Sequence, residues 1–414
     1  MPTTSLNIEQ QRMRTSLSVQ SSSSLASSLL TKRAAATRQG CNNSQTQSRR
    51  KNKFNYRVEK AKQLIIDYGN GKRAVGQDTS SCTLYPGECK QLLQQIEDDA
   101  TVKNIFEDQI RYDYNADNRG KNNKREKQFA IRMITKLHGC LTDEIDTAIK
   151  EKRYDIKKGR AQCGTKICPE QYCTHEHTKE IAKNIRGERS SSVRSSAAAG
   201  SDKKDPDLSY RYNDKQLTYP GLVVELGWSQ PRSSLHKKCK WYIEKGHGEV
   251  RTAIAVDLCD LYKCYPKPKT RPQGPSQAEQ NKAVDQDMTK MAEAIKKNKA
   301  LGKIYVWRAK IDSHTGRATA VLDADASKIF RDENGNAADQ VALRLLLEDF
   351  VPNKVLEQIG ASHNPEFPVM SAGLCSEFYR ALRQQISWDR LEEEEKERER
   401  EAKEQPKEDK GNEV

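Results

Sequence analysis

Two acidic residues lie in or beside segments that predict neighbouring strands. Glu225 stands within LVVEL (222–226), whose apolar side chains predict a buried strand. Asp207 comes directly before LSYRY (208–212), which predicts a strand that turns at Asn213-Asp214 and pairs with the first. A carboxylate inside a sheet is costly unless a metal ion, a cation or hydrogen-bond donors compensate its charge. We therefore expect Asp207 and Glu225 to share such a partner.

A divalent metal ion is the partner with the most direct chemistry. Two carboxylates and a backbone carbonyl, here that of Leu226, form the oxygen-only type of site that Mg²⁺ prefers. Such an ion binds a phosphate oxygen and lowers the pKa of a water molecule. A nearby lysine then orients the water or stabilises the charge that develops on phosphorus. Asp207 and Glu225 are therefore candidate metal ligands and catalytic residues.

The lysine is expected on a helix that follows the Glu225 strand. Apolar residues spaced three and four apart predict this helix from about Ser233 to Lys245, ahead of a strand at 250–258. Lys238 flanks one edge of its core face, whereas His236 and Lys240 flank the other. Geometry alone does not choose between the two edges, and Gln230 is a further residue that can line the site.

The order of these segments resembles the PD-(D/E)xK nuclease superfamily, in particular restriction-endonuclease-like proteins of the Uma2 type and similar fungal proteins. In that pattern Pro-Asp precedes a hairpin whose second strand reads roughly lvvEv.S. A helix with K-x-x-x-Y and a Gly four residues later follows, and then a strand that ends in vD. The matching segments are Pro206-Asp207, LVVELGWS (222–229), Lys238 to Tyr242 with Gly246, and IAVDL (254–258).

The resemblance is close over residues 200–260 and loose over 90–350. It implies an α/β fold with a restriction-endonuclease-like mixed central sheet, flanked by helices, and Mg²⁺-dependent hydrolysis of DNA phosphodiesters. In the usual pattern a lysine stands two residues after the glutamate, but here that position is Gly227. Uma2-like members carry the basic residue on the helix instead, and this selects Lys238 as the third catalytic residue.

Two other interpretations stay open. Glu225 can form a structural ion pair with a lysine or arginine, with Asp207 acting only as a turn residue. The chain would then be a non-catalytic nucleic-acid-binding protein that keeps the nuclease fold. It would otherwise be an interaction module that recruits a protein partner through its charged, coiled-coil-like C-terminal helix. DNA binding that is sensitive to salt but not followed by cleavage would indicate the first of these.

Charge and composition agree with a nucleic-acid partner. The chain of 414 residues has a net charge of +14. The segment from Asp389 to Val414 holds 12 acidic and 7 basic residues, so it carries −5 and leaves +19 on the rest. A basic body with an acidic tail fits a surface that binds polyanions such as DNA, although excess Lys and Arg also serve solubility. No apolar run approaches the ~18 residues that cross a bilayer, so we expect a soluble protein without a membrane partner.

The cysteines indicate a reducing intracellular compartment. Eleven cysteines are scattered along the chain, without the density of a disulfide scaffold or a secretory signal peptide. The basic cluster RRKNK (49–53) is compatible with a nuclear import signal, so the nucleus and the cytoplasm both stay open, and the Ser- and Arg-rich start leaves a mitochondrial destination open. Five potential zinc ligands lack the common C-x2-C spacing, so we expect reduced thiols rather than structural zinc. They are Cys163, Cys168, Cys173, His175 and His177.

Composition divides the chain into three parts. Residues 1–53 form a basic Ser- and Thr-rich tail with too little apolar surface to fold alone. Residues 54–365 form the α/β domain with loop insertions, and residues 366–414 form a charged helix that ends in a second disordered tail. Within the domain, helices are predicted at about 87–112 and 125–150. Residues 185–205 are predicted to form a surface loop.

Overall fold

The computed structural model of this chain describes most residues between 43 and 404. The described ranges are 43–69, 79–115, 128–133, 135–160, 176–188, 191–195, 201–266, 276–352, 354–355, 357 and 364–404. The chain divides into two units, Met1–Arg49 and Arg50–Val414. Of the predicted N-terminal tail, residues 43–53 belong to helix α1 (Asn43–Gly69), and residues 1–42 lie outside the described ranges.

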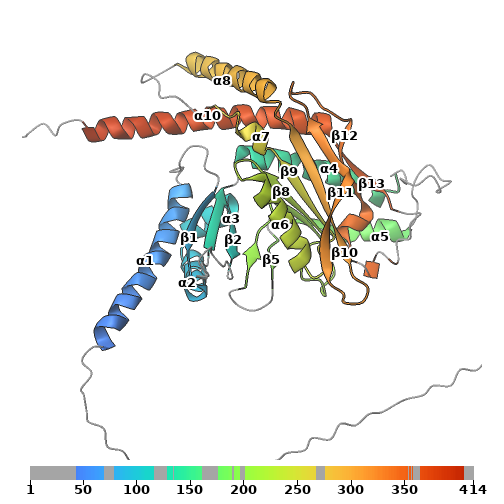
Figure 1. Cartoon of the computed structure of the whole chain (residues 1–414), viewed down its shortest axis with the longest axis horizontal. Coiled ribbons are helices and arrows are strands. Elements are labelled where there is room, and N and C mark those ends of the chain that lie inside the picture. The colour runs from blue at the N-terminus through green and yellow to red at the C-terminus, as the bar shows by residue number, and fades with distance from the viewer. Residues whose placement is uncertain are drawn as a thin grey trace, which may run out of the picture. The chain divides into compact units, whose positions relative to one another are not determined.

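The first sheet has its own small core. Its strand order is β1-β3-β2-β6-β5 with antiparallel neighbours. Helices α1, α2 (Pro86–Glu97) and α3 (Ala100–Gln109) pack on it through a separate apolar cluster (Figure 1). Its strands are β1 (Thr79–Thr83), β2 (Ile110–Asn115), β3 (Gln128–Met133), β5 (Val193–Arg194) and β6 (Lys203–Lys204).

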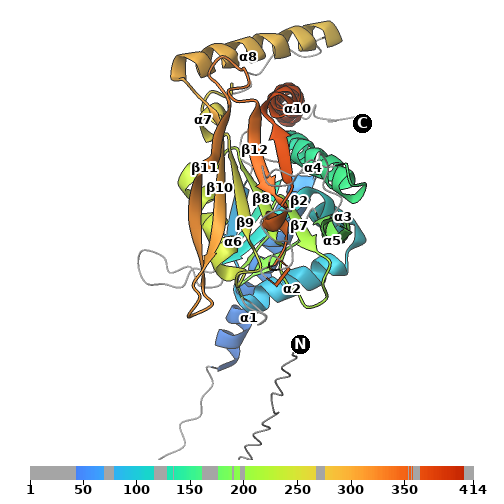
Figure 2. The same cartoon turned by 90° about the vertical axis from the view of Figure 1, so that its right-hand side faces the viewer.

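The second sheet is mixed and larger, with the order β11-β10-β9-β8-β7-β4 (Figure 2). All its neighbours are antiparallel except β8 and β9, which are parallel and joined by helix α6 (Arg232–Lys245). Its strands are β4 (Ile185–Glu188), β7 (Leu208–Tyr212), β8 (Leu222–Gly227), β9 (Thr252–Asp257), β10 (Gly302–Ile311) and β11 (Ala318–Arg331).

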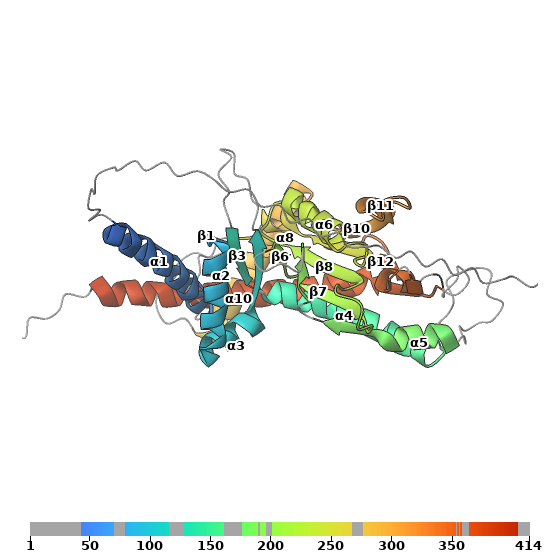
Figure 3. The same cartoon turned by 90° about the horizontal axis from the view of Figure 1, so that it is seen from below.

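Alternation along β8 distributes its side chains between two helices. Leu222, Val224 and Leu226 join the apolar cluster of helix α4 (Lys136–Lys157), whereas Val223 joins the cluster of α6. Figure 3 shows α4 and α6 on opposite sides of β7 and β8. All six residues of β8 are buried as a result, so Glu225 must face α6.

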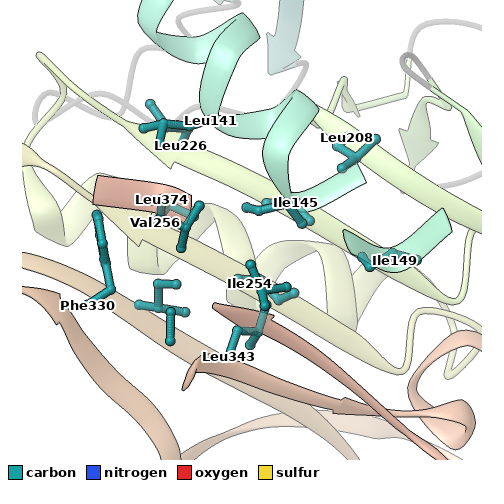
Figure 4. Close-up of a cluster of buried hydrophobic side chains, with 14 of the residues drawn as sticks. Leu141, Ile145, Ile149, Leu208, Leu226, Ile254, Val256, Phe330, Leu343 and Leu374 are labelled. Atoms are coloured by element: carbon teal, nitrogen blue, oxygen red, sulfur yellow. The ribbon is translucent and has the colours of Figure 1, made fainter. Parts of the chain in front are cut away.

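The α4 side of the sheet holds the main core. Leu141, Ile145 and Ile149 follow one another at four-residue spacing along α4 and pack on the strands (Figure 4). Each such buried aliphatic side chain contributes about 1.5–3 kcal/mol to folding. Thr135 caps the helix, since its hydroxyl accepts from the backbone N–H of His138.

The remaining elements cover the second sheet and its edges. Strands β12 (Val341–Leu346) and β13 (Glu366–Met370) form a separate pair, and the short helix η1 (Leu347–Phe350) follows β12. Helix α10 (Ser371–Glu404) places its first half in the main core, so residues 366–386, predicted as the start of a separate charged helix, pack with the domain. The other helices are α5 (Glu176–Asn184), α7 (Cys259–Tyr262) and α8 (Gln277–Asn298).

The structure corrects three of the expected elements. The helix predicted at 87–112 is instead α2, α3 and the start of β2, and the helix predicted at 125–150 begins with strand β3. Residues 185–205, predicted as a loop, contain strands β4, β5 and β6. The expected fold class holds in its general form, a mixed sheet flanked by helices. Among the described helices, none is long and apolar enough to cross a membrane.

Candidate functional site

The register of the β7–β8 hairpin brings the two predicted carboxylates together. Leu208 pairs with Val224, and one further step along this antiparallel register places Asp207 opposite Glu225. The backbone N–H of Asp207 donates to the Val224 carbonyl at 3.1 Å, which extends the ladder to this position. Residues directly opposite each other on one face of a sheet are close enough to interact. Asp207 and Glu225 therefore lie side by side, facing α6.

Both carboxylates meet the same nitrogen atom. Arg132, on β3 of the first sheet, places Nη1 at 3.2 Å from Asp207 Oδ1 and 3.3 Å from Glu225 Oε2. Its Nη2 donates to the backbone carbonyl of Asp205 at 2.6 Å. Only 9% of the Arg132 side chain is exposed, and Glu225 is fully buried. The partner that Glu225 requires is thus, first of all, a guanidinium group.

Lys238 and Tyr242 approach the same carboxylate from α6. Lys238 Nζ lies 3.1 Å from Glu225 Oε1, and the Tyr242 hydroxyl donates to that oxygen at 2.6 Å. The two residues are four apart and therefore share one side of the helix. His236 and Lys240 lie instead beside Trp307, whose indole N–H donates to His236. Of the two helix edges, the one with Lys238 faces the carboxylates.

A third carboxylate, Asp113 on β2, completes the group. Its Oδ1 atom lies 3.1 Å from Lys238 Nζ and 3.8 Å from Arg132 Nη2. Asp113 pairs in the first sheet with Lys204, the last residue of β6, and the chain then runs through Asp205 into the second sheet. This short connection is where the two sheets meet. We call the six residues the Glu225 cluster: Asp113, Arg132, Asp207, Glu225, Lys238 and Tyr242.

Gly227 explains why the lysine comes from the helix. A Cβ atom at Gly227 would lie only 2.7 Å from Leu235 Cδ2, because α6 packs closely on β8 at this point. A lysine two residues after Glu225 would therefore displace the Leu235 side chain from its packed position. Leu226, expected to contribute its carbonyl, donates its backbone N–H to Asp207 Oδ2 at 2.8 Å. This contact fixes the orientation of the Asp207 carboxylate.

The pKa of Glu225 is shifted upward, whereas the pKa values of its two acidic neighbours are shifted downward. Burial raises the pKa of Glu225 to about 7, although Lys238 and Arg132 both favour its charged form. At Asp207, burial is the largest effect and acts against ionisation, but Arg132, His138, Lys238 and the Leu226 N–H together outweigh it, so the pKa lies below its ordinary value. The pKa of Asp113 is likewise lowered, since Lys238 and Arg132 overcome the effect of burial. Glu225 is thus the carboxylate that takes up a proton most readily.

A cavity of about 1190 Å³ borders the cluster. Its walls come from α1, β1, the segment from Ser229 to Ser234 and Tyr262. Asp113 and Arg132 line it, whereas Asp207, Glu225 and Lys238 lie behind them. Gln230 also lines this cavity, and its buried Nε2 atom has no hydrogen-bond partner among the described residues. The cavity gives a ligand access to the cluster from the side of Arg132.

The predicted zinc ligands give no site in the described part of the chain. Cys163, Cys168, Cys173 and His175 lie outside the described residues, and His177 is exposed on α5. Where the structure is described, no group of three or more His, Cys, Asp or Glu residues is arranged to hold a metal ion. At the Glu225 cluster, Arg132 and Lys238 occupy the space between the three carboxylates.

Sequence reasoning missed Asp113 and Arg132, which the structure adds to the predicted residues. Large apolar side chains occupy every second position of two segments and are all buried in the first sheet: Tyr112, Tyr114, Phe129 and Ile131. This period of two, on either side of a polar loop, is the signal of a hairpin that the helical interpretation overlooked. No protein-family model, curated protein or solved structure matches this chain.

Proposed function

We propose that this chain is a PD-(D/E)xK-like nuclease domain that hydrolyses DNA phosphodiesters with the help of Mg²⁺. The observation that carries the proposal is the meeting of Asp207 and Glu225 on one point, at 3.2 and 3.3 Å from Arg132 Nη1. Two carboxylates that converge in this way on neighbouring strands, beside a lysine and a cavity, are typical of a catalytic site rather than of a core ion pair.

The topology around the site supports the proposal. Strands β7 and β8 form an antiparallel hairpin, and α6 and β9 follow it, with β9 parallel to β8. Asp207 directly precedes β7, and Glu225 lies on β8. This is the order of elements that the resemblance implies, with the acids at the corresponding positions.

The donors are chemically suited to Mg²⁺, which prefers carboxylate and carbonyl oxygens. Asp207 and Glu225 would hold the ion, and the Leu226 carbonyl is the third ligand that the resemblance implies. When bound, Mg²⁺ would polarise a phosphate oxygen and lower the pKa of a water molecule. Arg132 now stands where the two carboxylates meet, so binding requires it to give way.

The protein's own groups have distinct tasks in this proposal. Tyr242 holds Glu225 Oε1 in place through its hydroxyl, and the Leu226 N–H does the same for Asp207 Oδ2. Lys238 lies within 3.1 Å of Glu225, where its ammonium group can orient a water molecule and stabilise charge on the phosphate. The cavity beside Asp113 and Arg132 receives the substrate strand.

A second function is favoured by the charge balance of the same cluster. Arg132 and Lys238 already neutralise two of the three carboxylates. If that arrangement is permanent, the domain binds nucleic acid without cleaving it. Binding that weakens steeply with salt, in the absence of cleavage, would support this function.

The test is a cleavage assay on the full chain with supercoiled plasmid and single-stranded DNA, in Mg²⁺ and in EDTA. Glu225→Gln should reduce Mg²⁺-dependent cleavage by at least about 100-fold, the loss typical of removing one group that stabilises a transition state. Glu244→Gln is the matched control, because Glu244 is exposed on the same helix as Lys238. Equal cleavage by wild type and Glu225→Gln, or none by wild type, would rule out the proposed enzyme.

A further inference from the structure

Arg132 differs from the other cation of the cluster in where it comes from. Lys238 belongs to α6, which packs directly on the strands that carry the acids. Arg132 belongs to β3 of the first sheet, so it reaches Asp207 and Glu225 from a different layer of the protein. Its Nε atom is buried and has no hydrogen-bond partner among the described residues. Its contacts to the second sheet are therefore made by the two terminal nitrogens of the guanidinium alone.

Arg132 also lies between the cavity and the acids. The cavity wall includes Arg132 and Asp113 but not Asp207 or Glu225. A cation or an anion that enters the cavity therefore meets the guanidinium before it reaches the two carboxylates. A guanidinium can bind a carboxylate or a phosphate in the same two-pronged manner, and phosphate is a favoured partner.

The charge of the cluster makes the Arg132 guanidinium and a divalent cation alternative partners of the carboxylates. With Asp113, Asp207 and Glu225 charged, Arg132 and Lys238 leave the cluster at −1. Without the guanidinium the charge would be −2, which a divalent cation neutralises. Arg132 and a divalent ion are thus alternative partners of the same oxygen atoms.

We infer that Arg132 is an exchangeable counter-ion that couples substrate binding to metal binding. In the free protein it occupies the meeting point of Asp207 and Glu225. A phosphodiester in the cavity draws the guanidinium onto its own oxygens, and the released carboxylates bind the divalent ion. The inference rests on the proposed function for the identity of the anion. Because binding free energies are reciprocal, the phosphodiester and the ion must raise each other's affinity by the same factor.

The experiment measures metal affinity, so it does not depend on cleavage. Mn²⁺ binding to the full chain is followed by calorimetry, with and without a short oligothymidylate carrying phosphorothioate links. Arg132→Gln should bind Mn²⁺ about 10- to 100-fold more tightly than wild type without the oligonucleotide, the range in which neighbours of metal ligands usually act. Wild type should gain Mn²⁺ affinity when the oligonucleotide is present, and Arg132→Gln should lose most of this gain.

Two further variants make the result decisive. Arg186→Gln removes the same charge from an exposed position on β4 and should leave Mn²⁺ affinity unchanged. Arg132→Lys keeps the charge but has one nitrogen in place of the two that hold the carboxylates and the Asp205 carbonyl, so its Mn²⁺ affinity should lie between those of wild type and Arg132→Gln, and it replaces Arg132→Gln if that variant does not fold. Affinity that no Arg132 variant increases, including an absence of binding, overturns the inference. Increased affinity without cleavage by any variant supports the inference while rejecting the nuclease.

Discussion

Two buried acidic residues, Asp349 and Glu225, have opposite surroundings. Asp349, in η1, accepts hydrogen bonds from Thr252 and Arg308 through Oδ1 and from the Leu346 N–H through Oδ2. Arg308 in turn donates to Asp323 at 2.8 Å. We call these four residues the Asp349 cluster: Thr252, Arg308, Asp323 and Asp349. Each carboxylate of this cluster thus has its own set of donors.

The Glu225 cluster lacks this match between donors and acceptors. Two carboxylates share one nitrogen of Arg132, and Asp113 Oδ1 is held by the ammonium of Lys238 at 3.1 Å without a well-aligned hydrogen bond from any described residue. The large cavity borders this cluster and not Asp349. The comparison shows that burial of a charge does not by itself indicate function. Like charges that converge on one counter-ion beside a cavity mark a candidate site, because the two carboxylates make each other's charge costly.

The largest effect on stability is expected at Asp349. Asp349→Ala removes a carboxylate that serves Thr252, Leu346 and Arg308, and it leaves the guanidinium with only Asp323. We expect a loss of about 3–5 kcal/mol in the free energy of unfolding. Urea unfolding followed by circular dichroism measures it, with the exposed Asp339→Ala as control. A loss as small as that of the control would mean that the Asp349 cluster is not structural.

A smaller loss is expected from restoring the lysine of the family pattern at Gly227. Gly227→Lys places a Cβ atom 2.7 Å from Leu235 Cδ2, so the buried Leu235 side chain must shift and the packing of α6 on β8 is disturbed. Such overpacking typically costs about 1–3 kcal/mol. The same variant should not restore cleavage to Lys238→Met, because its side chain cannot enter the site. Recovery of cleavage in the double variant would show that α6 is less closely packed than this contact requires.

Glu225→Gln tests whether the Glu225 cluster, unlike the Asp349 cluster, contributes little to stability. In this variant Arg132 still forms its ion pair with Asp207, and Lys238 still forms its ion pair with Asp113. The amide oxygen of Gln can still accept the hydrogen bond from the Tyr242 hydroxyl. A neutral side chain also avoids the cost of burying a charge. We expect the free energy of unfolding to change by no more than about 1 kcal/mol, even though cleavage is lost. A loss close to that of Asp349→Ala would make Glu225 a structural residue instead.

The sequence was sufficient to predict the segment from Leu208 to Asp257 because its signals are local. The alternation of β7 and β8, the turn between them and the apolar spacing of α6 each lie within a few residues. The helical spacing left two edges of α6 open, and only the resemblance favoured Lys238 over His236 and Lys240. The Asp207–Glu225 pair could therefore be predicted, although its partner could not.

The partner could not be predicted because it depends on pairing between distant segments. Arg132 lies 93 residues before Glu225 and belongs to a different sheet. Helical spacing in α2 and α3 continues by chance into Ile110, so the strand β2 was interpreted as the end of a helix. Its alternating tyrosines, with Phe129 and Ile131 opposite, make sense only when the hairpin is seen as a unit.

The smallest effect is a pH dependence that separates two acids of the Asp349 cluster. Burial raises the pKa of Asp349 above its ordinary value of 3.8, despite Arg308. The folded state therefore holds this proton more tightly, and between 3.8 and the raised pKa the free energy of unfolding falls as pH rises. At Asp323 burial is outweighed by backbone N–H donors and Arg308, so its pKa is lowered. Between that lowered pKa and 3.8, Asp323 makes the free energy of unfolding rise with pH.

These two slopes have opposite signs and lie in different pH windows, so single variants can resolve them. Unfolding free energies of wild type minus Asp349→Asn should decrease with pH above 3.8 and then level off. The same difference for Asp323→Asn should increase with pH below 3.8 and be constant above it. Because one arginine serves both acids, the contrast arises from burial rather than from the charge of the partner. Identical slopes for the two variants would show that Asp349 and Asp323 depend on one shared counter-ion, as Asp207 and Glu225 do. The Asp349 cluster and the Glu225 cluster would then no longer differ in this respect.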